Sequence, residues 1–362
     1  MAPSDRLQTI AQARQALLHG QGRSPSIPPT LAPWLQRSWQ RCQGWGLEPG
    51  RAVEFEAVSA AQMRRVQEAS APLVQAARPV LAELVRAMGD IGYFAILTNA
   101  EGIVVDVHGP VDRRDRRADV IARVGVDLSE RAVGTTAIGA ALTELQPVWL
   151  HRGEHFFDDT SVYSCAGAPV FGPDGHCAGM LDLTGVEVTE RPALKHLVRR
   201  SARSIENGWL LAAPHALTLR LNWPGNQPGD DSDGLLTLDA NGRITGANPT
   251  ARQMLALEGG CADAHAADVF AMPWDNLFDA ARRDHGVCEV PLWSGLRLQA
   301  RAQRAGEAAA PSPRGSGKAL RDVQTELIRQ AVVQARGNVA EAARALGISR
   351  ATVYRKLGSP KG

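Results

Sequence analysis

Long apolar runs and paired cysteines are both missing from this 362-residue sequence. No run of eighteen or more apolar residues occurs, and residues 1–13 carry charges and glutamine instead of a signal-peptide core. Neither a membrane span nor a secretion signal is therefore predicted. The five cysteines are odd in number, scattered and without a C-x-x-C pair, which argues against a disulfide framework and a structural zinc site. We expect a cytoplasmic protein with no membrane partner.

The small net charge of +2 conceals a difference between the two ends of the chain. From Lys318 onward there are nine Lys/Arg against three Asp/Glu, a net charge of +6, whereas the rest has 31 against 35, a net charge of −4. A basic tail behind a mildly acidic body is typical of a nucleic-acid-binding appendage. The alternative is a solvated basic C-terminus, which predicts no accompanying helical pattern.

The sequence length favours two or three domains, and the first two segments fit an α+β multidomain fold. Residues 1–49 are interpreted as a helical lead-in and residues 50–212 as an α+β sensor domain. Its sheet begins with "YFAILTNAEGIVVDV", in which a turn separates two apolar runs, the pattern of a β-hairpin. The other elements expected there are helices at 59–88 and 189–211 and strands at 148–151, 162–170 and 176–182.

A second α/β segment is predicted at 232–303, after a linker at 213–231 that is rich in Pro, Gly and Asp. It opens with "GLLTLDANGRITGANPTARQMLAL", which again indicates strand, turn and strand, here followed by a helix. Asn248 before a proline suits the start of that helix. The likeness to the first hairpin suggests two sensor domains built in the same way. A second linker is expected at 304–317.

The tail, 318–362, is predicted to be all α-helical. Its first helix has an apolar stripe that begins at Leu320, and Gly337 ends it. Asn338 can cap the next helix, in which Val339, Ala342, Ala343 and Leu346 form one apolar face. Gly347-Ile348-Ser349 then supplies a tight turn, with Ser349 as the cap of the last helix.

In the last helix one face is basic and polar, which is the pattern of a recognition helix in a helix-turn-helix. Arg350 can contact guanine through two hydrogen bonds, and Thr352 can contact a base or a phosphate. Arg355 and Lys356 suit phosphate contacts, which give affinity without sequence information. The alternative is a helical hairpin with a merely charged face. The residues expected at the DNA are Asn338, Ser349, Arg350, Thr352, Tyr354, Arg355 and Lys356.

Quoted in full, "RGNVAEAARALGISRATVYRKL" resembles the Fis-type helix-turn-helix of bacterial enhancer-binding activators. Upstream, "PWLQRSWQRCQGWGLEP", "GVDLSERAVGTTAIGAAL" and "GEHFFDDTSVYSCAGAPVFGPDGHCAGMLDLTG" resemble the sensor region of regulators of the acetoin-catabolism type. This resemblance implies a GAF domain at 50–212, and the segment 232–303 is similar to a PAS domain, more so in its first half. It also implies a homodimer that presents two recognition helices to a palindromic site on double-stranded DNA.

Members of this family usually carry an AAA+ ATPase between sensor and helix-turn-helix, and no segment here is predicted to be one. "GSGK" at 315–318 lacks the G-x-x-x-x-G-K-[ST] pattern, because position 312 is Ser and position 319 is Ala. A GAFTGA-like sigma-contact loop is absent from the sequence as well. No ATPase activity and no cofactor are expected.

The stretch "HRGEHFFDDTSVYSC" concentrates groups that could bind a ligand or a metal. Its spacing matches no zinc pattern, so no metal site is predicted. The resemblance implies instead that this loop and the next strand line the GAF pocket, where Glu154, His155 and Cys165 are the candidate contacts for a small-molecule effector.

Two further features have alternative interpretations. Cys165 and Cys177 lie on consecutive predicted strands, as a GAF-type methionine sulfoxide reductase would require, but inert core cysteines are the more economical interpretation. The tryptophans at 34, 39 and 45 could stack on a partner, although core packing of a helix explains them as well.

Two function classes therefore remain. The favoured one is a non-enzymatic, signal-responsive transcription regulator that acts with RNA polymerase or with a full-length activator. The other is a dimeric adaptor whose basic tail contacts DNA without sequence preference.

Overall fold

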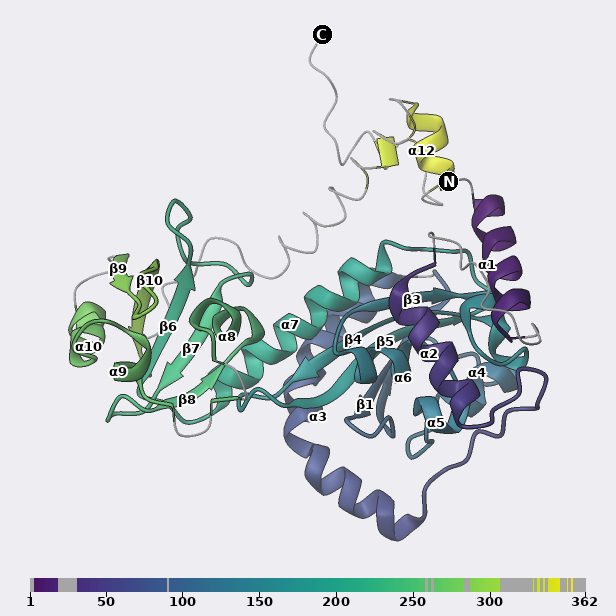
Figure 1. Ribbon diagram of the computed structural model, residues 1–362, viewed down its shortest axis with the longest axis horizontal. Coiled ribbons are helices and arrows are strands. Elements are labelled where there is room, and N and C mark those ends of the chain that lie inside the picture. The colour runs from purple at the N-terminus through teal and green to yellow at the C-terminus, as the bar shows by residue number, and fades with distance from the viewer. Residues whose placement is uncertain are drawn as a thin grey trace. The chain divides into compact units, whose positions relative to one another are not determined.

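The computed structural model describes residues 3–18, 31–89, 91–257, 260–261, 264–282 and 287–306, and in the C-terminal region 328, 331–332, 335, 338–345, 350 and 353. The chain divides into two compact units, Met1–Glu307 and Ala308–Gly362. Figure 1 labels the elements of both. No helix among the described residues is long and apolar enough to span a membrane.

Three helices precede the first sheet: α1 (Pro3–Leu18), α2 (Pro33–Gly44) and α3 (Ala60–Met88). Helix α3 starts at a serine cap, because the Ser59 hydroxyl accepts a hydrogen bond from the backbone N–H of Gln62. The buried residues of α3 recur at three- and four-residue intervals, so the helix is amphipathic and packs along one side only. These residues are Val66, Ser70, Leu73, Ala77, Leu81, Leu84 and Met88.

The first sheet is antiparallel, with the strand order β2-β1-β5-β4-β3. Its central strand β5 is the last of the five in the chain and pairs with both β1 and β4. This confirms the expected α+β class of the sensor region. The strands are β1 (Tyr93–Asn99), β2 (Val104–His108), β3 (Val148–His151), β4 (Tyr163–Phe171) and β5 (Cys177–Val186).

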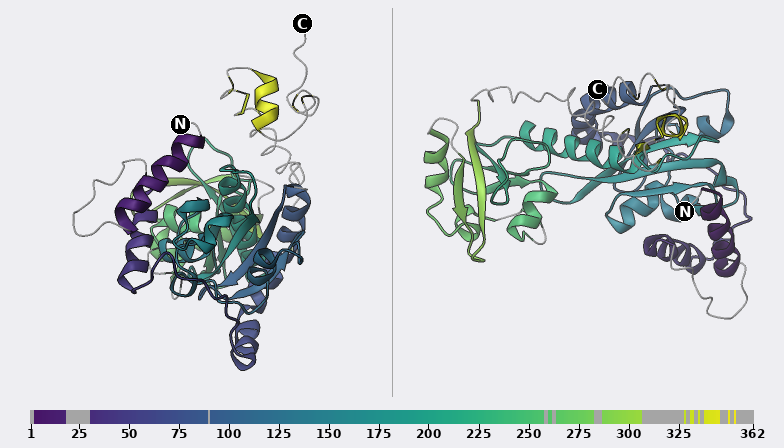
Figure 2. Two further views of the ribbon diagram at one scale, coloured as in Figure 1. Left: turned by 90° about the vertical axis from the view of Figure 1, so that its right-hand side faces the viewer. Right: turned by 90° about the horizontal axis from the view of Figure 1, so that it is seen from above.

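Each face of this sheet has its own hydrophobic core, and β5 contributes to both. Leu181 and Leu183 of β5 pack with α3 and α7 (Leu194–Ala212). Met180 lies in the other cluster, with α2 and the short helices that follow β2. Figure 2 shows α3 and α2 on opposite sides of the sheet. The short helices are α4 (Arg116–Ile121), α5 (Glu130–Val133) and α6 (Ala137–Glu144), and two 3-10 turns follow, η1 (Arg152–Glu154) and η2 (Asp159–Val162).

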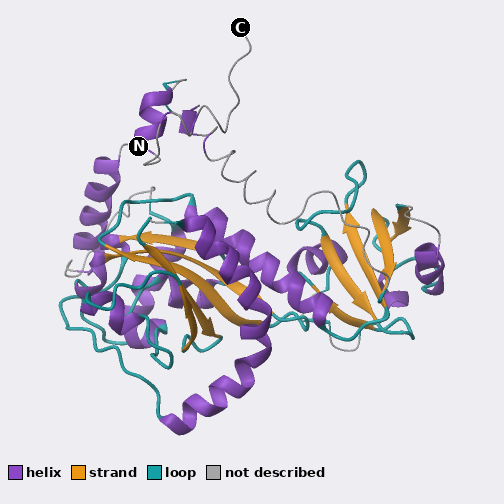
Figure 3. Ribbon diagram, turned by 180° about the vertical axis from the view of Figure 1, so that it is seen from behind, coloured by secondary structure: helices purple, strands orange, loops and turns teal. Residues whose placement is uncertain are grey.

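The second sheet is also antiparallel and five-stranded, with the order β8-β7-β6-β10-β9 (Figure 3). Asn248 caps α8 as expected, because its Oδ1 accepts hydrogen bonds from the backbone N–H groups of Ala251 and Leu235. The elements are β6 (Leu217–Asn222), β7 (Gly234–Leu238), β8 (Ile244–Ala247), α8 (Pro249–Leu255), α9 (Ala266–Val269), α10 (Asp275–Arg282), β9 (Cys288–Pro291) and β10 (Arg297–Arg304).

The two sheets correspond strand by strand. In each, a hairpin (β1/β2 or β7/β8) and a second strand pair (β4/β3 or β10/β9) flank one central strand. The central strand comes last in the first sheet and first in the second. The central strand of the second sheet, β6, is formed by residues 217–222 and thus lies inside 213–231, where a linker was expected. Its Leu217, Leu219 and Leu221 are fully buried.

The turn between β4 and β5 contacts the second sheet's domain. The backbone carbonyl of Gly175 accepts a hydrogen bond from the Arg252 guanidinium, and the Pro173 carbonyl accepts one from Ala247 N–H at 3.1 Å. Gly175 has φ +92°, a conformation that favours glycine. A Cβ there would also displace the Arg252 guanidinium, the end of a flexible side chain, from its contact with the turn.

In the C-terminal unit the described elements agree with the expected helix-turn-helix. Helix α12 (Val339–Ala345) begins after Asn338, whose Oδ1 accepts a hydrogen bond from the Ala340 backbone N–H at 3.1 Å. Ile328, Ala343 and Val353, one from each of the three segments predicted to be helical, form a buried cluster. The small alanine permits this close approach, as the sequence predicts.

Candidate functional site

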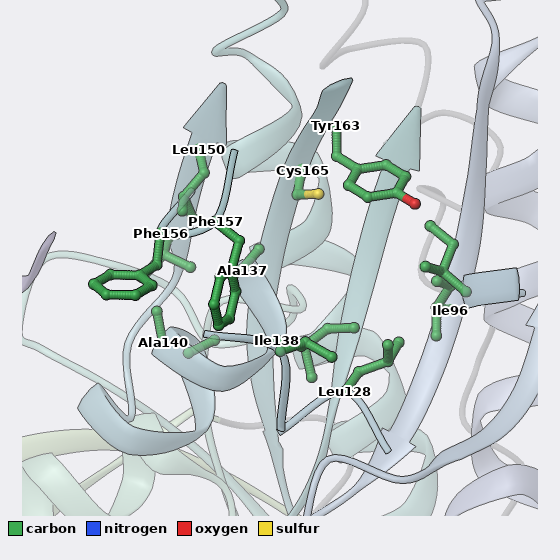
Figure 4. Packing of buried hydrophobic residues seen from close by; sticks show 14 of the residues in the cluster. Ile96, Leu128, Ala137, Ile138, Ala140, Leu150, Phe156, Phe157, Tyr163 and Cys165 are labelled. Atoms are coloured by element: carbon green, nitrogen blue, oxygen red, sulfur yellow. The ribbon is translucent and has the colours of Figure 1, made fainter. Parts of the chain in front are cut away.

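A cavity of about 30 Å³ lies between the first sheet and the helices α4 and α6; we call it the central cavity. Figure 4 shows the side chains of Tyr163 and Cys165 facing the same space as Ile96, Leu128 and Ile138. Most of its wall is apolar, with polar groups from β4 and β5 and from Thr136, His155 and Thr160 outside the strands. The lining residues are Phe55, Ile96, Ile121, Leu128, Thr136, Ala137, Ile138, His155, Thr160, Tyr163, Cys165, Asp182 and Thr184.

Helix α6 is held over the sheet by its first turn. Thr136 caps it, since its Oγ1 accepts a hydrogen bond from the Gly139 backbone N–H at 3.2 Å. Opposite, Gly167 of β4 leaves room for the helix, because a Cβ at that position would lie 3.0 Å from the Ala137 carbonyl oxygen. The helix therefore contacts β4 closely and places Ala137 and Ile138 in the cavity wall.

His155 is fully buried in the cavity wall. Its Nδ1 lies 2.9 Å from the Arg152 carbonyl oxygen, which can only accept, so Nδ1 carries the proton. Burial lowers the pKa of His155 to about 4, with the Arg152 carbonyl opposing this in part. At neutral pH the imidazole is uncharged, and its Nε2 is a hydrogen-bond acceptor.

Cys165 of β4 lies beside this histidine, and its Sγ is 3.6 Å from His155 Nε2. Burial raises the pKa of the Cys165 thiol well above its usual value, and the nearby Asp182 carboxyl raises it further. The protonated thiol is a weak nucleophile, because the thiolate is the reactive form. His155 and Cys165 thus meet in the cavity as polar parts of an apolar wall, and their contact with an effector stays a prediction.

Asp182 is the acidic residue of the central cavity and has no solvent exposure. One carboxylate oxygen, Oδ2, accepts a hydrogen bond from the Thr184 hydroxyl. The other, Oδ1, is the single buried side-chain oxygen without a hydrogen-bond partner within the described part of the chain. Burial raises the pKa of Asp182 to about 7, and the Thr184 hydrogen bond acts in the opposite direction.

Glu154, the third residue expected at the pocket, does not line the central cavity. Its Oε1 pairs with the Arg6 guanidinium of α1 at 2.5 Å, and its Oε2 accepts from the His151 backbone N–H at 2.7 Å. It faces a separate groove of about 280 Å³, formed with α1, α2, Trp149 and Lys195. The cause is local: Glu154 ends the 3-10 turn η1, and the next residue, His155, is directed into the core.

The alternative chemistries find little geometric support. Among the described residues, no group of three or more His, Cys, Asp and Glu side chains is placed to hold a metal ion. Cys177 is paired with Phe171, six residues along β4 from Cys165, so the two cysteines are not neighbours. Trp39 is fully buried and donates its Nε1–H to the Glu154 carbonyl, whereas Trp45 is 41% exposed.

Of the expected DNA-contacting residues, the structure describes two. Asn338 is exposed and caps α12, and Arg350 is helical and exposed. Val353, also helical, is fully buried against Ile328 and Ala343. Ser349, Thr352, Tyr354, Arg355 and Lys356 lie outside the described residues.

Asp182 was not predicted to be a site residue, because the sequence places it at the end of the predicted strand 176–182. The sequence does contain a signal, because "GMLDLTG" places one carboxylate inside an otherwise apolar strand. An acidic residue there is buried on one face of the sheet and calls for a specific partner. Thr184, two residues on, shares that face.

An α+β domain with a cavity against one face of its sheet, followed by a helix-turn-helix, defines the class of transcription regulators with an N-terminal sensor. Comparison with known proteins agrees. The family described as "MimR, N-terminal domain" matches residues 9–207. "Bacterial regulatory protein, Fis family" matches residues 319–358.

The similar proteins include two curated regulators. The chain is 33% identical over 283 residues to the acetoin catabolism regulatory protein of Cupriavidus necator, covering 75% of this chain and 41% of that protein. It is 28% identical over 207 residues to the propane 2-monooxygenase operon transcriptional activator MimR of Mycolicibacterium goodii, covering 57% of this chain and 34% of the relative. The chain thus spans less than half the length of these relatives.

A similar solved structure is the DhaR(N)–DhaL complex of E. coli, with 14% identity and a TM-score of 0.46 over 75% of this chain and 99% of that chain. The chain belongs to the MimR/AcoR-type family of transcription regulators, with a MimR-type N-terminal domain and a Fis-type helix-turn-helix.

Proposed function

We propose that this protein is a signal-responsive regulator that binds a specific palindromic DNA site as a homodimer and takes its signal from a small molecule in the central cavity. The observation that carries the proposal is the presence of a MimR-type sensor and a Fis-type helix-turn-helix in one chain. A sensor and a DNA-binding unit in one chain provide an input and an output.

Sequence recognition rests on the segment that begins at Arg350. An exposed arginine at the start of a recognition helix is positioned to contact a base edge in the major groove. Two such helices in a dimer would meet half-sites about one DNA turn apart. Lys356 and Arg355, by sequence, supply phosphate contacts.

The regulator works without ATP hydrolysis of its own. Between the second sheet, which ends at Arg304, and the Fis-type match, which begins at residue 319, the sequence holds only the Pro- and Gly-rich linker. It therefore acts with RNA polymerase, by occupying its site, or through a full-length activator at a shared site. The cell compartment we propose is the cytoplasm.

The second five-stranded domain is PAS-like in this proposal. The support is its hairpin, which repeats the pattern of the first domain, and the strand order that it shares with the first sheet. Its contact with the β4–β5 turn through Arg252 joins it to the central strand of the sensor sheet. A change at the central cavity can thus reach the second domain through β5.

A DNA-binding assay with matched variants tests the proposal. Arg350→Ala should weaken binding to the specific site by about tenfold or more while leaving random DNA little affected, since a lost base contact costs roughly 1–3 kcal/mol. Lys356→Ala should weaken both equally, because a phosphate contact carries no sequence information. Equal weakening by Arg350→Ala would leave only non-specific binding. Purified protein should also hydrolyse no ATP above background.

The second candidate is a dimeric adaptor that modulates a full-length activator. It is favoured by the basic tail, which from Lys318 onward carries nine Lys/Arg against three Asp/Glu and can contact DNA without sequence preference. The adaptor predicts no preference among DNA sequences and a stable complex with such an activator, so the same DNA-binding assay separates the two.

A further inference from the structure

The central cavity contains a carboxylate oxygen that is unusual for a protein interior. Asp182 is fully buried in the middle strand of the sheet, and its Oδ1 has no hydrogen-bond partner. A buried acceptor left unmatched costs about 1–3 kcal/mol, more for a charged group. Such a cost is typical of residues kept for function rather than for stability.

The hydroxyl groups around the cavity are largely committed as donors to other atoms. Tyr163 Oη–H donates to the Arg117 carbonyl at 2.9 Å, and Thr160 Oγ1–H donates to the Phe157 carbonyl at 2.9 Å. The Thr184 hydroxyl donates to Asp182 Oδ2. None of these hydrogens is directed at Asp182 Oδ1.

The second acceptor of the cavity is His155 Nε2. Because Nδ1 donates to the Arg152 carbonyl, Nε2 has a free lone pair, and its nearest donor is the weak thiol of Cys165 at 3.6 Å. The lining includes no Lys or Arg, so the cavity has acceptors but no cation. A carboxylate or phosphate ligand would find no opposite charge there.

We propose that Asp182 is the polar anchor of the sensor, and that it selects a small aliphatic compound bearing a hydrogen-bond donor, a hydroxyl or an amine. The inference deepens the proposed function and rests on it. Isoleucine, leucine and phenylalanine side chains enclose the carbon skeleton, and the donor meets Asp182 Oδ1. His155 Nε2 accepts from a second donor where the compound has one.

The cavity must widen to admit such a compound. At about 30 Å³ it holds roughly two waters, so even a four-carbon molecule displaces part of the wall. A hydrogen bond to Asp182 Oδ1 offsets the free-energy cost of this widening only for a compound that carries a donor. A molecule without a donor fills the space and leaves Oδ1 without a hydrogen bond.

Site-resolved NMR of the full chain, labelled at the isoleucine δ1-methyl groups, tests the proposal. Ile96, Ile121 and Ile138 line the cavity, whereas Ile205 packs on the other face of the sheet and Ile244 in the second domain. The probes are butan-1-ol, butan-1-amine, butan-2-one and butyrate at pH 8.5, where the carboxyl can accept but not donate.

Butan-1-ol or butan-1-amine should shift the three cavity methyls and bind at least about fivefold more tightly than butan-2-one. For the alcohol this is the worth of one hydrogen bond; the amine, an ammonium ion at this pH, donates a charge-assisted hydrogen bond instead. The tighter of the two identifies the donor as hydroxyl or amine. Butan-2-one or butyrate binding as tightly as both donors would overturn the proposal. Failure of all four to move these methyls, which would mean that the cavity holds only water, overturns it too.

Three variants make the result specific. Asp182→Leu, similar in shape but apolar, should abolish the advantage of the donor, while Ile138→Val, in the same wall, should preserve it. Thr184→Val releases Oδ2 as a second acceptor, so the advantage should persist or grow. A donor advantage that survives Asp182→Leu contradicts the proposal. DNA binding measured on the same samples keeps this outcome separate from the regulator proposal, because neither readout depends on the other.

Discussion

His155 Nε2 lies 3.6 Å from Cys165 Sγ, in a contact that joins the η1 turn to the strand β4. Neither group is charged, because burial lowers the pKa of the imidazole to about 4 and raises that of the thiol. The pair is therefore a neutral polar contact in an apolar cavity wall. It lacks the thiolate that a reductase would need.

The low pKa of His155 predicts one component of acid sensitivity. Its folded-state pKa of about 4 lies below the ordinary value of 6.5, so the stability it contributes is present above pH 6.5 and is lost as the pH falls toward 4. His155→Asn keeps a donor for the Arg152 carbonyl but does not titrate. Melting temperatures at pH 7.5 and 5 should show a smaller acid-induced drop in the variant; an equal drop would contradict the buried, neutral histidine.

Asp182 predicts the opposite pH dependence. Its folded-state pKa of about 7 lies above the ordinary value of 3.8, so the stability it contributes is present below pH 3.8 and is lost as the pH rises to about 7. Its neighbours in the cavity are Thr184, His155, Cys165 and Tyr163.

Asp182→Leu should therefore raise the melting temperature at pH 8, by removing a cost of about 1–3 kcal/mol, and should raise it less at pH 5. Glu206, whose pKa burial also raises to about 7, is present in both proteins and cancels in the comparison. A variant that is less stable than the wild type at pH 8 would mean that the carboxylate is a structural requirement.

Two arginines on α2 offer a matched test of burial. The Arg41 guanidinium, 25% exposed, binds Glu130, whose side chain is 3% exposed, at 2.7 Å and Glu144 at 2.8 Å. Arg37, 51% exposed, binds Glu144, which keeps Arg41 as a partner when Arg37 is replaced. Arg41→Leu should cost about 3 kcal/mol, because it leaves a buried carboxylate unpaired. Arg37→Leu should cost about 1 kcal/mol or less. Equal shifts in denaturant midpoint would contradict this assignment.

Two glycines with the same φ angle allow the effect of backbone strain to be distinguished from the effect of a side-chain contact. Gly175 and Gly225 both have φ +92°, but a Cβ clashes with Arg252 only at Gly175, and the space around Gly225 is open. Both alanine variants should lose about 1 kcal/mol from backbone strain. Only Gly175→Ala should also loosen α8, measured as faster amide hydrogen exchange at residues 249–255. Equal exchange in the two variants would contradict the role of the β4–β5 turn.

The sequence predicts much of the fold because apolar runs and turn residues mark the first sheet clearly. Strand β6 was missed because Pro- and Gly-rich residues follow it directly, although Leu217, Leu219 and Leu221 alternate with polar residues as in a half-buried strand. The order of strands in space could not be read from these local patterns.

The three residues that the resemblance implied at the pocket are separated in the structure. His155 and Cys165 line the cavity, whereas Glu154 faces another groove, because a tight turn separates the directions of adjacent side chains. That His155 and Cys165 contact an effector stays a prediction. The register of β5 with its two neighbouring strands places Asp182 in the site, opposite Gly167 of β4 and Ile96 of β1. Local sequence patterns do not determine that register.

The most direct test of the regulator proposal is selection of double-stranded DNA from a random pool by the purified full chain. A sequence-specific dimeric regulator should enrich one palindromic sequence with half-sites about one helical turn apart. The same selection with Arg350→Ala should lose the preference at the contacted base. Recovery of DNA without any enriched sequence would contradict the proposal and favour the adaptor.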